Sequence, residues 1–66
     1  MTEDYVLRIL RWQMSYTTQR AWAREHGVSK SLVGDVLTGR RGLGPKILEA
    51  MGIEKMEEVT YRWKDG

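Results

Sequence analysis

Apolar positions recur at helical spacing along most of the chain and change to strand spacing only near its end. The first segment follows this pattern and predicts a core helix over about residues 3–15, with Thr2 as its N-cap. Its apolar arc consists of Tyr5, Val6, Ile9, Leu10, Trp12 and Met14, and its polar stripe consists of Asp4, Arg8, Arg11 and Ser15. We therefore expect this helix to have one narrow solvent-exposed face and one broad buried face.

Capping residues predict two further short helices, over about residues 18–26 and 29–38. Thr18 and Ser29 each carry a hydroxyl that suits an N-cap, and Gly27 suits the left-handed position that ends a helix. Only two residues separate the two predicted helices, so they form a tightly joined pair.

A fourth helix is predicted over about residues 45–51. Pro45 favours the first helical position, and Gly52 favours the helix end. With no linker, repeat or low-complexity stretch in the sequence, we expect residues 1–66 to form a single, mainly α-helical domain.

The end of the chain alternates and predicts one strand over about residues 58–63. One face carries Val59, Tyr61 and Trp63; the other carries Glu58, Thr60, Arg62 and Lys64. A lone strand leaves backbone groups unpaired, so we expect antiparallel pairing with the same strand of a second subunit, about an axis at residue 60 or 61. The predicted dimer contacts are Val59, Tyr61, Arg62 and Trp63. An irregular tail and a helix over Glu54–Val59 are the alternatives.

The region over about residues 18–52 resembles the lambda Cro and repressor-like (XRE) helix-turn-helix family, especially its small phage-type members. The residues that carry the resemblance, over about residues 18–52, are Gln19, Ala23, Gly27, Val28, Ser29, Val33, Val36 and Gly39, with the following Gly-Arg-Arg-Gly-Leu-Gly-Pro. The chain departs from the family at Leu37, where a polar or acidic residue often pairs with an arginine of the first helix. We expect packing to replace that pair.

The resemblance implies that the third helix reads DNA in the major groove. Its base-reading positions are Lys30, Ser31, Gly34 and Asp35. Asp35 would accept a bond from cytosine, brace an arginine or discriminate against wrong sequences. Gly34 would either permit close approach to DNA or be present by chance. The expected phosphate contacts are Gln19, Arg40, Arg41 and Lys46. Trp22 is expected in the core rather than as a stacking platform for a base.

Charge is distributed unevenly, which agrees with this assignment. Residues 18–46 hold six of the lysine and arginine residues and only two acidic residues, whereas residues 47–66 hold three basic and five acidic residues. A positive charge concentrated on the predicted reading unit suits phosphate binding. The alternative is that these side chains only solvate a small domain.

Composition excludes several other classes. The chain has no cysteine and one histidine, so neither a disulfide framework nor a cysteine-based metal site is expected. No catalytic set or phosphate-cradling loop is present, so we expect no enzyme, cofactor or small-molecule substrate. Arg8 and Arg11 interrupt the first apolar run, which argues against a signal peptide or membrane span and for a cytoplasmic protein.

Two functions are compatible with the sequence. The first is a DNA-binding transcriptional regulator of Cro or repressor type that binds a palindromic operator as a homodimer. The second is a protein-interaction module, such as an antitoxin or a phage factor that engages a host protein, without sequence-specific DNA binding.

Overall fold

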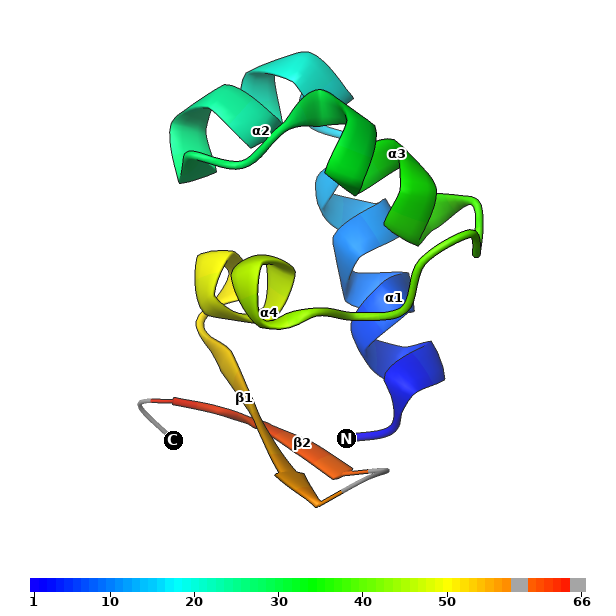
Figure 1. Cartoon of the computed structure of the whole chain (residues 1–66), viewed down its shortest axis with the longest axis vertical. Coiled ribbons are helices and arrows are strands. Elements are labelled where there is room, and N and C mark those ends of the chain that lie inside the picture. Colours follow the sequence, from blue (N-terminus) through cyan, green and yellow to red (C-terminus); the bar gives the residue numbers. More distant parts are fainter. Residues whose placement is uncertain (58–59, 65–66) are drawn as a thin grey trace.

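The computed structural model describes residues 1–57 and 60–64. Four helices are followed by a two-stranded antiparallel sheet, which lies at the opposite end of the molecule from α2 and α3 (Figure 1). The elements are α1 (Glu3–Gln13), α2 (Gln19–His26), α3 (Lys30–Leu37), α4 (Pro45–Met51), β1 (Ile53–Glu57) and β2 (Thr60–Trp63). The mainly helical class is confirmed.

The predicted capping residues form the helix ends. The hydroxyls of Thr2, Thr18 and Ser29 each accept a hydrogen bond from the amide three residues later, at 3.2, 3.0 and 3.0 Å. Gly27 and Gly52 have φ values of 68° and 75°, in the left-handed region that glycine adopts without strain. These short-range signals therefore locate α1, α2, α3 and α4 to within about two residues.

The hydrophobic core collects one or more residues from every element. Its buried members are Val6, Leu10, Trp22, Ala23, Val33, Val36, Ile47, Leu48, Met51, Ile53 and Tyr61. The core position predicted for Trp22 is confirmed. On α1 the predicted apolar arc is too wide, because Tyr5 and Trp12 are 50% and 61% exposed. A chain of this size covers only a narrow face of its first helix, here centred on Val6 and Leu10.

A partly buried hydrogen bond joins the end of α1 to α2. The indole Nε1 of Trp22 donates to Oε1 of Gln13 at 2.9 Å, and Trp22 is 3% exposed. The bond lets a large aromatic residue enter the core without leaving its N–H group unsatisfied.

The strand near the chain end is present as β2, but the prediction that it lacks a partner within the chain is wrong. β1 pairs with it in an antiparallel hairpin, in which Ile53 faces Trp63 and Glu54 faces Arg62, with an irregularity between Lys55 and Glu57. Residues 54–57 are therefore extended, which also excludes the helix considered for Glu54–Val59 and the irregular tail. The sequence of β1 does not alternate, so its strand character depends on pairing.

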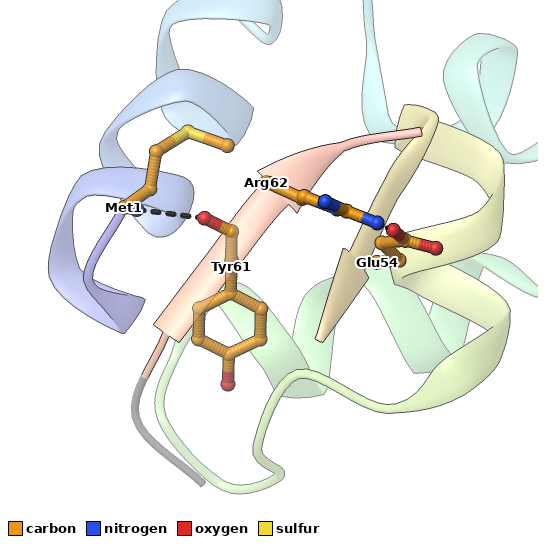
Figure 2. Close-up of polar contacts among 4 residues, drawn as sticks. All are labelled: Met1, Glu54, Tyr61 and Arg62. Carbon is orange, nitrogen blue, oxygen red and sulfur yellow. Dashed lines mark hydrogen bonds and ion pairs between the residues drawn. The ribbon is translucent and has the colours of Figure 1, made fainter. Parts of the chain in front are cut away.

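The other edge of β2 is bonded to the first residue of the chain. Met1 and Tyr61 exchange both backbone hydrogen bonds, at 2.7 and 2.8 Å, as two residues facing each other in an antiparallel ladder do. Figure 2 shows the bond from the Met1 nitrogen to the Tyr61 carbonyl. A symmetric ribbon of two β2 strands about residue 60 or 61 would have to displace either β1 or Met1.

Two of the four residues predicted to join subunits have side-chain contacts within the chain. Tyr61 is 3% exposed and belongs to the core, and the Arg62 guanidinium donates to the Glu54 carboxylate at 2.5 Å (Figure 2). Trp63 is 43% exposed at the end of β2. Val59 lies outside the described residues. β2 is paired within the chain, so it does not need a second subunit to satisfy its backbone groups.

The buried tyrosine predicts a loss of stability at alkaline pH. Burial raises the pKa of the Tyr61 phenol above its ordinary value of 10.0, and the Glu3 carboxylate adds to the shift. The unfolded chain then releases this proton at lower pH than the folded chain, so the tyrosine's contribution is complete below pH 10 and declines as pH rises further. Between pH 8 and 11, the Tm of Tyr61→Phe should fall less steeply with rising pH than the Tm of wild type. Parallel profiles would contradict this assignment.

Candidate nucleic-acid interface

The first residue of α2 and the middle of α3 lie against each other on one face. A Cβ atom placed on Gly34 would come 3.4 Å from Oε1 of Gln19, so the glutamine side chain lies over the glycine. Both residues are half-buried. A candidate phosphate contact and a candidate base-reading position are therefore direct neighbours, although 15 residues separate them in the sequence.

The first turn of α3 is open to solvent. Ser29 ends the turn from α2 and caps α3, so Lys30 and Ser31 follow immediately and are both exposed. Asp35 comes one turn after Ser31 and is half-buried. This short helix buries Val33 and Val36 on its opposite side, which directs its polar residues outward.

A hollow of about 430 Å³ lies between α3 and the start of α4. Candidate residues from both sides line it, namely Ser31 and Asp35 on α3, Arg41 in the connecting loop and Lys46 on the first turn of α4. The remaining lining residues are Ser29, Leu32, Gly44, Pro45 and Ile47. Two cationic side chains thus face one carboxylate and a hydroxyl across an open depression.

Backbone bonds hold the arginine pair at the end of α3. Gly39, at φ 83°, allows the chain to reverse, and the amides of Arg40 and Arg41 both donate to the Asp35 carbonyl, at 2.9 and 3.1 Å. The amide of Gly39 donates to the Val36 carbonyl at 3.3 Å, which completes a Schellman ending. The two arginine side chains are exposed, on a loop whose backbone is tied to the helix.

Leu37 contacts its surroundings both by packing and through a backbone hydrogen bond to α1. The Leu37 side chain is half-buried against the core, and its carbonyl accepts a hydrogen bond from Nη2 of Arg11 at 3.3 Å. An arginine of the first helix thus reaches this position through the backbone. Sequence alone did not reveal the contact, because any residue at position 37 would supply the same carbonyl.

The structure therefore brings six of the eight candidate residues together around α3, with Gln19 beside Gly34 and with Ser31, Asp35, Arg41 and Lys46 around the hollow. We use the term reading face for Gln19, Lys30, Ser31, Gly34, Asp35, Arg40, Arg41 and Lys46. Lys30 and Arg40 belong to it by their exposed positions next to Ser31 and Arg41, although neither lines the hollow. The face offers hydrogen-bond donors and positive charge to an anionic ligand.

Among residues 1–57 and 60–64, no group of three or more His, Cys, Asp and Glu side chains is placed to hold a metal ion. Within the same residues, none of the helices has the length and apolar character needed to cross a membrane.

We compared the chain with models of protein families, with curated proteins and with solved structures, and no match was found in any of the three comparisons.

Proposed function

We propose that this protein is a sequence-specific DNA-binding transcriptional regulator of Cro or repressor type. In this proposal α2 and α3 form a lambda-repressor-like helix-turn-helix, and α3 enters the major groove. The observation that carries the proposal is the convergence on one face of residues from α2, from α3 and from the loop leading to α4, with Gln19 lying over Gly34. Arg41 and Lys46 give that face the positive charge that DNA phosphates require.

Base reading is assigned to the outward positions of α3. Lys30 donates to guanine O6 and N7, Ser31 contacts a base edge, and Asp35 accepts from cytosine N4. Gly34 lets the helix backbone approach the bases. These roles fit a helix whose first turn is exposed and whose opposite side is fully buried.

Phosphate contacts are assigned to the flanks of the same helix. Gln19 binds on one side, while Arg40, Arg41 and Lys46 bind on the other. The bonds from the amides of Arg40 and Arg41 to Asp35 support these roles, because they place both arginines at a constant distance from α3. The regulator binds a palindromic operator as a dimer in the cytoplasm, with reading helices about one DNA turn, ~34 Å, apart.

Selection of purified protein on a random pool of double-stranded DNA tests the proposal. We expect enrichment of an inverted repeat whose half-sites are centred about 10 base pairs apart. A pool that stays random would overturn the proposal and favour the protein-interaction module, in which the basic surface serves no sequence-specific purpose.

Lys30→Ala should reduce discrimination at one base pair in each half-site. We expect a loss of ~1 to 3 kcal/mol in binding free energy on the selected site and little loss on unrelated DNA. Titrations of both DNAs by fluorescence anisotropy at one salt concentration measure the difference. Equal losses on the two DNAs would instead make Lys30 a phosphate contact.

Gly34→Ala should stabilise the protein and weaken its DNA binding. Alanine is favoured over glycine in a helix interior by about 1 kcal/mol, and the nearest atom to its Cβ is the glutamine oxygen at 3.4 Å, an ordinary contact. The added methyl group would occupy the space that the bases require. The free energy of unfolding in urea should therefore rise, while the affinity for the operator should fall. Undiminished operator affinity in the stabilised variant would show that α3 does not approach DNA at this position.

A further inference from the structure

One side of α1 carries a row of exposed aromatic residues outside the reading face. Tyr5, Trp12 and Tyr16 are 50%, 61% and 74% exposed, and the half-buried Ile9 lies between the first two. A spacing of seven residues places Tyr5 and Trp12 on one ridge of α1, and Tyr16 lies in the turn that follows the helix. The rings of Trp12 and Tyr16 meet edge to face, with centroids 5.0 Å apart. We call these four residues the aromatic stripe.

Such a row differs from the scattered apolar residues of an ordinary surface. Tyrosine and tryptophan are the residues that contribute most energy to protein interfaces, and a contiguous apolar patch marks an interaction site. α1 already buries its core face through Val6 and Leu10, and of the stripe only Ile9 packs against the core. Its aromatic composition therefore calls for a partner outside the chain.

We propose that the aromatic stripe binds the same stripe of a second copy, with the two α1 helices antiparallel. The stripe is complementary to itself in this arrangement. With the twofold axis level with residues 10 and 11, Ile9 lies opposite Trp12 of the second copy, and Tyr5 lies opposite the turn that carries its Tyr16. Arg8, which borders the stripe, comes level with Gln13 of the second copy, one residue from Trp12, so its guanidinium can reach the indole.

The opposite orientation is less favourable. Parallel helices in register would bring Arg8 against Arg8 and Asp4 against Asp4, and would align the two helix dipoles. Antiparallel helices separate these like charges and oppose the dipoles. An isologous contact of this kind also closes at two copies, as a symmetric dimer requires.

The exposed area indicates a weak dimer. Each aromatic side chain offers roughly 100 to 150 Å² at its observed exposure, so two stripes and their borders bury about 1,000 Å² in total. That value lies at the lower end for specific complexes, and we expect dissociation constants of about 10 to 100 µM. The inference goes beyond the proposed function, because the pairing needs no DNA. It replaces the β2 ribbon, whose edge at Tyr61 is bonded to Met1.

Sedimentation equilibrium without DNA provides the first test. Wild type should dimerise within this range, and Trp12→Ser should weaken the dimer at least tenfold while the helical circular dichroism signal is retained. Met56→Ser is the matched control, because Met56 is also exposed, at 47%, but lies on β1. A monomer at all concentrations, or equal effects of the two substitutions, would overturn the proposal.

Cysteine cross-linking tests the orientation, because the chain contains no cysteine of its own. Tyr5→Cys and Tyr16→Cys should form a disulfide-linked dimer when the two variants are mixed and oxidised, and much less when either is oxidised alone. Equal or stronger linking of Tyr5→Cys alone would contradict the antiparallel register. Both tests omit DNA, so their failure leaves the selection of an operator by the reading face unaffected.

Discussion

Replacing Arg40 and Arg41 together by glutamine will weaken binding to the operator and to unrelated DNA by similar factors. Both side chains are exposed on a loop that two hydrogen bonds to the Asp35 carbonyl hold beside α3. Each phosphate contact releases about 0.9 counterion, so the slope of log K against log salt should flatten by ~2 units. Titrations at 50 to 200 mM salt measure this change.

The control for this experiment removes the same charge from the hairpin. Lys55→Gln combined with Lys64→Gln also lowers the net charge by two, but these lysines lie on and next to the hairpin. For this double variant, the slope of log K against log salt should match that of wild type. If the two double variants flatten the slope equally, the loss reflects net charge and the loop is not part of the interface.

Gln13→Leu is expected to destabilise the protein by about 1 to 3 kcal/mol, because it leaves a buried indole N–H group without an acceptor. Gln13 accepts the hydrogen bond from Trp22 at 2.9 Å, inside the junction of α1 and α2. In a domain of 60 to 100 residues each kcal/mol corresponds to a shift of about 4 to 8 °C in Tm. Thermal and urea unfolding should report the same loss.

Two companion variants separate the hydrogen bond from packing. Gln13→Glu retains an acceptor oxygen at the same distance along the side chain and should cost less than Gln13→Leu. Trp22→Phe removes the donor, so adding Gln13→Leu to it should cost less than in the wild-type background. Additive losses would show that the two side chains act independently.

Local signals account for what could be predicted of the fold. A hydroxyl at Thr18 or Ser29 acts on an amide three residues away, and Gly27 ends α2 by its own backbone freedom, so each can be recognised from a few neighbouring residues. The four helices were located in this way. The candidate residues of the reading face then came together because α2 and α3 are closely joined.

Contacts between distant residues could not be predicted. β1 has the sequence Ile-Glu-Lys-Met-Glu, in which only the pairing with β2 establishes an extended conformation. The bond from Arg11 to the Leu37 carbonyl has a backbone acceptor, which no residue type signals. The exposure of Tyr5 and Trp12 depends on how much of α1 the small core covers, and helical periodicity alone does not determine that extent.

The ladder between Met1 and Tyr61 also bears on the order of folding events. These residues are 60 positions apart, whereas the widest pair of the hairpin, Ile53 and Trp63, is separated by only ten. Closing the longer loop costs about 1.6 kcal/mol more in chain entropy, so the hairpin should form first and dock against the start of α1 late. Substitutions that weaken the docked ladder should therefore accelerate unfolding while leaving the refolding rate almost unchanged.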